Sequence, residues 1–192
     1  MTFWLEISVG KYFGIMRSSN IRHIRLVFTQ YVPCTVLPLR GVNLLTDEQK
    51  KDDIFYVCTL IEYIARKTKN HRSDLIRYFT KPRLRRQLRL APVNHCLSFE
   101  QVADELIEEY GISYGTYDTV AECKYTVPAE TAIGRVYQQL VWSVSENDDY
   151  EQAIIDVFSS FISDEISDFN SSVYYQNPDY LKCSYEDGKL LA

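Results

Sequence analysis

The residues best suited to chemistry form one basic cluster. Ten of the chain's 21 lysines and arginines lie within residues 66–89, where Asp74 is the only acid. Guanidinium and ammonium groups bind carboxylates and phosphates, so this segment offers anion recognition. We predict that a partner is contacted by four arginines and that three further cations contribute at the edge: Arg83, Arg85, Arg86 and Arg89, with Lys67, Lys69 and Arg72 outside them.

Residues that could catalyse a reaction or hold a metal are sparse. His95 precedes Cys96, but adjacent side chains point about 100° apart on a helix and to opposite faces of a strand, which disfavours a nucleophile–base pair. The acids between residues 104 and 109 have the spacing of a solvated helix face, and no loop completes a cation shell. We therefore expect a non-enzymatic protein with no catalytic residue, metal or cofactor.

The composition indicates one globular domain. The chain has 192 residues, of which 46% are hydrophobic, enough to bury a sizeable core. It contains no run of about 18 apolar residues and no secretory signal pattern, so we expect no membrane contact and a cytoplasmic location. The five cysteines are odd in number and form no CxxC pair, which is typical of free thiols in a reducing compartment.

The charge is unevenly distributed, and this leaves three interpretations of the basic cluster open. The net charge is −5, and residues 90–192 carry four basic residues against nineteen acids. The cluster could bind a protein partner, it could bind nucleic acid as part of a helix-turn-helix-like unit whose last helix starts at Pro82, or its cations could pair with the downstream acids. We expect a protein partner and keep nucleic acid as the alternative. The oligomeric state does not follow from these features.

Periodic apolar residues and capping signals predict consecutive helices from Thr46 onward. Thr46 and Gln49 form a capping box for a helix that reaches about Lys69. Later helices are expected in four places: a short one capped by Ser73, one opened by Pro82, one from a second capping box at Ser98 and Gln101 to Gly111, and one from Pro128 to Val144. Residues 112–127 mix glycine, threonine and tyrosine and predict a loop with one or two short strands.

The C-terminal part predicts further helices and an aromatic strip. One helix starts at Asp148 or Asp149 and runs through Phe161, and two short helices follow, separated at Asn177 and Pro178. The tail contains five aromatic residues, which we expect to close over the core, with a partner groove as the alternative: Phe169, Tyr174, Tyr175, Tyr180 and Tyr185.

These elements define a mainly α-helical, bundle-like single domain over residues 44–192, with a basic subregion at 44–112 and an acidic subregion at 113–192. Residues 1–43 differ from the rest, because alternating apolar residues and two prolines indicate short strands or irregular chain. We treat them as an N-terminal extension. Their basic, acid-poor composition is also compatible with an organelle transit peptide.

A resemblance covers about residues 52–112. The order FYVCTLIEYIARKTKNHRSDLIRYF, a short helix, and then NHCLSFEQVADELIEEYGI resembles a small uncharacterised helical family of bacteria, chiefly Firmicutes, which is often encoded beside a predicted ADP-ribosyltransferase-like protein. The resemblance implies the non-enzymatic member of a toxin–antitoxin-like pair. The segment PRLRRQLRL is more basic here than in that family. We accordingly expect a protein-interaction module with an antitoxin-like or regulatory role.

Overall fold

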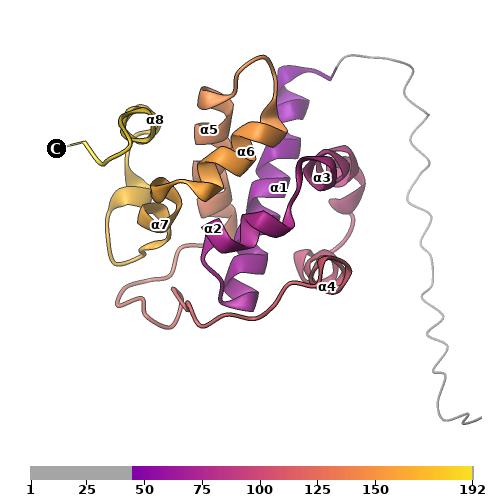
Figure 1. The fold of residues 1–192 in the computed structure, drawn as a ribbon, viewed down its shortest axis with the longest axis horizontal. Coiled ribbons are helices and arrows are strands. Elements are labelled where there is room, and N and C mark those ends of the chain that lie inside the picture. Colours follow the sequence, from indigo (N-terminus) through magenta and orange to yellow (C-terminus); the bar gives the residue numbers. More distant parts are fainter. Residues whose placement is uncertain (1–44, 192) are drawn as a thin grey trace, which may run out of the picture. The chain divides into compact units, whose positions relative to one another are not determined.

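The computed structural model describes residues 45–191, and this part of the chain is mainly α-helical (Figure 1). It contains eight α-helices, two 3-10 turns and no β-strand. The helices are α1 (Asp47–Thr68), α2 (Arg72–Leu75), α3 (Lys81–Asn94), α4 (Phe99–Tyr110), α5 (Glu130–Val144), α6 (Tyr150–Ser159), α7 (Phe161–Ser167) and α8 (Pro178–Asp187), and the 3-10 turns are Ile76–Tyr78 and Val173–Tyr175. The expected fold class is therefore confirmed. The expectations for residues 1–43 lie outside the described residues.

Helix α1 is the central element, with α5 on one side and α3 and α4 on the other (Figure 1). Its start is fixed by the predicted capping box, in which the Thr46 hydroxyl accepts from the Gln49 backbone and the Gln49 side chain accepts from the Thr46 backbone. Its end is fixed by Lys69, whose φ of 54° leaves the helical region. From Asp53 onward α1 is buried on nearly all sides, as a central helix requires, whereas its first turn and a half is partly exposed.

The closest helix packing lies between α1 and α5. Gly134 of α5 has no side chain, and a Cβ atom built there would lie 2.1 Å from the Thr59 hydroxyl and 2.9 Å from the Thr59 Cα of α1. Glycine therefore lets the two backbones approach. The buried face of α5 on either side of this position is apolar or aromatic, with Ile133 and Tyr137 both fully buried.

The predicted limits of several helices are confirmed, and others need correction. Gly111 ends α4 with a φ of 65°, and Asn177 caps α8 through a hydrogen bond from Asp179. The short helix after α1 starts at Arg72 and has His71 at its N-cap, so the predicted Ser73 cap is wrong. The Ser98 hydroxyl does cap α4 by accepting from the Gln101 backbone.

Two further boundaries differ from the prediction because a residue leaves the helical conformation. Helix α5 starts at Glu130, two residues after Pro128, because Ala129 is extended with a ψ of 148°. The helix expected to continue through Phe161 ends at Ser159, because Ser160 is extended and its hydroxyl donates to the Val157 carbonyl oxygen.

The segment between α4 and α5 contains turns and none of the predicted short strands. Its backbone amides donate partly within the segment, as from Glu122 to the Asp118 carbonyl oxygen, and partly to other parts of the chain. Gly115 N donates to Thr68 O and Tyr117 N to Lys69 O, each at 2.8 Å, at the end of α1. Because these bonds satisfy its backbone, the segment has a defined path without regular structure.

The aromatic strip of the C-terminal part is divided between core and surface. Phe169 and Tyr174 are buried, at 2% and 7% exposure, and Tyr180 and Tyr185 are partly buried against the core. Tyr175 is 74% exposed. Core packing is therefore confirmed for most of the strip, and Tyr175 does not follow it.

Candidate interaction surface and buried charge cluster

The four arginines of α3 that were predicted to contact a partner lie in different surroundings. Arg85 and Arg86 have side chains 59% and 50% exposed and pair with Glu151 at the start of α6 and Glu109 at the end of α4, the first at 2.8 Å. The Arg83 guanidinium donates to the Tyr78 carbonyl oxygen at 2.7 Å and lies 4.1 Å from the centre of the Tyr110 ring. Arg89 is exposed. Arg85, Arg86 and Arg89 are thus available on the surface, and Arg83 helps to hold α3 in place.

At the C-terminal end of α3, exposed apolar residues follow the exposed arginines. Arg85, Arg89 and Val93 are spaced four residues apart and therefore lie on one face of the helix. Val93 is 59% exposed, and Leu97 just beyond the helix is 40% exposed. The outer stripe of α3, which we define as Arg85, Arg86, Arg89, Val93 and Leu97, joins arginines to uncovered apolar surface.

The two lysines predicted at the edge pair with acids of the following segments. Lys67 Nζ lies 2.6 Å from Asp104 Oδ1, and Lys69 Nζ lies 3.0 Å from Asp118 Oδ2. The hydrogen bond from Lys69 and the backbone amide of Ala121 together lower the pKa of Asp118, with the backbone amide contributing most. Both lysines remain partly accessible, so contact with a partner is geometrically open to them.

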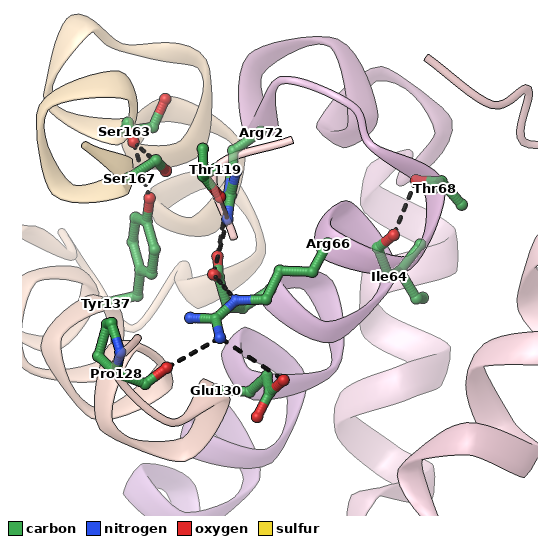
Figure 2. Close-up of polar contacts among 11 residues, drawn as sticks. Ile64, Arg66, Thr68, Arg72, Thr119, Pro128, Glu130, Tyr137, Ser163 and Ser167 are labelled. Atoms are coloured by element: carbon green, nitrogen blue, oxygen red, sulfur yellow. Dashed lines mark hydrogen bonds and ion pairs between the residues drawn. The ribbon is translucent and has the colours of Figure 1, made fainter. Parts of the chain in front are cut away.

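Arg72 does not lie on the surface, and its predicted place among the outer contacts is wrong for this structure. Its side chain is fully buried and donates two hydrogen bonds to Glu62 of α1, at 2.9 and 2.7 Å. It also lies 3.4 Å from the Thr119 hydroxyl (Figure 2). The side chain of Arg72, the first residue of α2, is thus directed toward α1.

Arg72 belongs to a buried charge cluster, which we define as Glu62, Arg66 and Arg72. Arg66 Nε donates to the same Glu62 carboxylate at 2.7 Å, and its Nη1 reaches the Pro128 carbonyl oxygen at 2.8 Å and Glu130 at 3.5 Å (Figure 2). The side chains of Glu62 and Arg66 are 0% and 6% exposed. Two cations therefore share one fully buried anion, and the second anion, Glu130, lies at the partly exposed edge of the cluster.

The electrostatics of this cluster keep Glu62 ionised. Burial alone would raise the pKa of Glu62, but the charge of Arg72 and its hydrogen bonds, followed by those of Arg66, outweigh burial and lower that pKa. One nitrogen of each guanidinium, Nη2 of Arg66 and Nη1 of Arg72, is buried and has no hydrogen-bond partner within residues 45–191. The cluster is thus richer in positive charge than in acceptors.

Most cations of the basic cluster at residues 66–89 are neutralised by acids of the same chain. Eight of the ten cations of residues 66–89 pair with a carboxylate of the described residues, and Arg83 and Arg89 are the exceptions. Seven of the pairing acids lie within residues 90–192: Glu100, Asp104, Glu109, Asp118, Glu130, Asp149 and Glu151. The exposed surface of α3 consequently carries mixed charge and not a single-sign field.

The other residues considered from the sequence for catalysis or metal binding lie at a helix end and on an exposed helix face. His95 is the C-terminal cap of α3, and its ring lies 4.8 Å from the Tyr56 ring, as expected for a helix-end residue. The acids on the outer face of α4, Asp104, Glu105, Glu108 and Glu109, are exposed, as the sequence predicts. In residues 45–191 no three histidine, cysteine or acidic side chains converge as a metal site.

One surface feature, a pocket formed beside two exposed tyrosines, was not predicted from the sequence. Tyr125 is 71% exposed and shares a pocket of about 430 Å³ with the exposed Tyr175. The sequence signal was the aromatic content of the tail, which suggested a groove as an alternative to core packing. That signal omitted Tyr125, because this residue belongs to the segment between α4 and α5.

Comparisons with known proteins do not place the chain in a family. No protein-family model matches it, and neither a curated protein nor a solved structure does. Among the helices of residues 45–191, none combines the length and the apolar character that crossing a membrane requires.

Proposed function

We propose that the protein is a non-catalytic protein-interaction module with an antitoxin-like or regulatory role in a bacterial cell, and that the outer stripe of α3 contacts the partner. The observation that carries the proposal is the continuity of exposed Arg85 and Arg89 with exposed Val93 along one face of α3, with exposed Leu97 just beyond the end of the helix. The antitoxin-like role rests on the resemblance over residues 52–112, which implies a non-enzymatic member of a toxin–antitoxin-like pair.

The composition of the stripe supports a protein partner. Arginine is enriched at protein interfaces and among the residues that dominate binding energy, and an apolar patch beside it supplies area that gains from leaving water. Glu109 and Glu151 also hold Arg86 and Arg85 in defined positions. Because these side chains are already ordered, association loses less conformational freedom.

The nucleic-acid alternative has less support from this geometry. A phosphate approaching Arg85 or Arg86 must compete with a carboxylate that already pairs with the guanidinium. The same carboxylates repel a duplex at close range. Binding to DNA or RNA through α3 would therefore require these pairs to open. Among the residues that the structure describes, Arg89 is the one exposed arginine of the stripe that pairs with no carboxylate.

The proposal is tested by affinity purification of the tagged full-length protein from cells that make it naturally, followed by quantitative mass spectrometry. Nuclease treatment and moderate salt are applied throughout. The test variant is Arg89→Glu combined with Val93→Asp, which alters the stripe and leaves the structural residue Arg83 in place. We expect one stoichiometric protein partner with the wild type and at least about tenfold less of it with the variant.

The matched control is Arg77→Glu, which repeats the arginine-to-glutamate part of the change at a side chain 77% exposed and outside α3. This control should retain the partner. Retention of the partner by the double variant would remove the α3 stripe from the interface. Recovery of nuclease-sensitive material alone would favour the nucleic-acid alternative, and recovery of nothing would indicate that the surface is only internally paired.

A further inference from the structure

The pocket beside Tyr125 and Tyr175 is formed by two segments distant in sequence. One is the end of the segment between α4 and α5, and the other connects α7 to α8. None of the described residues that line the pocket has a charged side chain: Tyr125, Thr126, Phe169, Asn170, Ser171, Ser172, Tyr174 and Tyr175. In a chain in which 24% of residues are charged, an uncharged pocket of about 430 Å³ at the surface indicates a neutral ligand.

The floor of this pocket is fixed by packing. Phe169 and Tyr174 are buried and meet edge to face, with ring centres 5.9 Å apart. The Arg66 guanidinium lies 4.7 Å from the Phe169 ring centre, so the buried charge cluster supports the floor from beneath. Burial, followed by a hydrogen bond with Tyr175, raises the pKa of Tyr174 to about 12, and its phenol therefore stays neutral at physiological pH.

One wall of the pocket is held by a side-chain amide. The Asn170 carboxamide accepts from the Lys124 backbone amide at 2.8 Å and donates to the Glu122 carbonyl oxygen at 3.2 Å. This amide links the two segments through its oxygen and one of its N–H groups. It consequently shapes the wall of the pocket.

The rim of the pocket is aromatic and exposed. Tyr125 and Tyr175 leave 71% and 74% of their surface in water, and the Tyr175 ring packs against Tyr174 with centres 4.0 Å apart. Each tyrosine combines a flat apolar face with a hydroxyl that can donate a hydrogen bond. A suitable ligand would cover the faces and accept from the hydroxyls.

We infer that this pocket binds an extended, uncharged peptide segment rich in proline, presented by a protein partner. Such a segment adopts the polyproline II conformation, in which the backbone carbonyls have no internal hydrogen bonds and can accept from tyrosine hydroxyls. Its pyrrolidine rings pack on aromatic faces, and its stiffness lowers the entropy lost on binding. The inference concerns a surface other than α3 and does not depend on the function proposed for that helix.

The inference is tested with acetylated and amidated decaproline, titrated into the full-length protein and followed by isothermal calorimetry or chemical-shift changes. A glycine–serine peptide of equal length serves as the flexible control. We expect saturable binding of decaproline only, with an affinity that changes less than about twofold between about 50 and about 300 mM sodium chloride, because no charges pair.

Site-directed variants assign that binding to the pocket. Tyr125→Ser combined with Tyr175→Ser should weaken it by about tenfold or more, whereas Tyr114→Ser, which removes a tyrosine 65% exposed outside the pocket, should leave it unchanged. Circular dichroism establishes that all variants are folded. Failure of the wild type to bind decaproline, or equal binding by the double variant, would overturn the inference. So would self-association that the tyrosine variant abolishes, since it would identify a second copy of the chain as the occupant.

Discussion

The buried charge cluster predicts an unequal response to removing its charges. Glu62 accepts three hydrogen bonds, one from Arg66 and two from Arg72. The variant Arg72→Met leaves one anion and one cation, which still pair at 2.7 Å. The variant Glu62→Gln leaves two buried cations with no buried anion between them. Although glutamate is the smaller side chain, its neutralisation should therefore destabilise the fold more.

The expected magnitudes follow from burial and hydrogen bonding. Breaking a buried pair so that a charge is left uncompensated costs about 3–5 kcal/mol, which we expect for Glu62→Gln. Arg72→Met loses two charge-assisted bonds but also removes the cost of burying a guanidinium, so we expect about 2 kcal/mol. At about 2–4 °C per kcal/mol, these changes correspond to decreases in Tm of about 6–20 °C and about 4–8 °C.

Urea denaturation followed by far-UV circular dichroism measures both values, and unchanged m-values would show that the unfolding transition is comparable. Glu108→Gln, at an exposed acid of α4, is the control and should change stability by less than about 0.5 kcal/mol. If Arg72→Met destabilised the protein as much as Glu62→Gln, excess positive charge would not control the stability of the cluster, and the reasoning would be refuted.

Two further predictions concern packing and pH. Gly134→Ala should lower the free energy of unfolding by about 2–3 kcal/mol, because its Cβ would collide with the Thr59 side chain and with the Thr59 Cα 2.9 Å away. Gly111→Ala meets open space and should cost only about 1 kcal/mol, because an alanine is strained at the left-handed φ of this position. Thermal melts of the two variants provide the comparison. The lowered pKa of Glu62 means that its stabilising contribution is present above the unfolded-state pKa of about 4.3 and is lost as pH falls through the lower folded-state pKa. Tm measured from about pH 6 to pH 3 should therefore fall less steeply in Glu62→Gln than in the wild type, and parallel curves would contradict this assignment.

The helical architecture could be predicted because local signals coincide with it. Thr46 and Gln49 cap α1 through contacts three residues apart, and Gly111 ends α4 by adopting a positive φ. The same periodicity places Arg85 and Arg89 on one face of α3. Boundaries were wrong where a single residue turned extended, as at Ser160, because the tertiary structure and not the local pattern ends that helix.

The candidate site could be predicted only in part, because its interactions join residues far apart in the sequence. Arg85 meets Glu151 across 66 positions, and Arg66 meets the Pro128 carbonyl across 62. Periodicity shows that Arg72 belongs to a basic run, but its burial depends on where α2 begins and on the position of Glu62. The tyrosine pocket likewise forms where two irregular segments come together. Neither helical nor strand periodicity in the sequence indicates such a contact.

Arg66 has a consequence for reading mutational scans of this protein. Its guanidinium donates to Glu62, reaches the Pro128 carbonyl and lies over the Phe169 ring, so one side chain faces three directions from a buried position. A lysine retains the charge but cannot reproduce the planar, multiply donating group. In a binding screen, substitutions at Arg66 would therefore look like mutations of ligand contacts, although the residue does not line the pocket. A loss of binding at this position would reflect a change in the fold that supports the pocket.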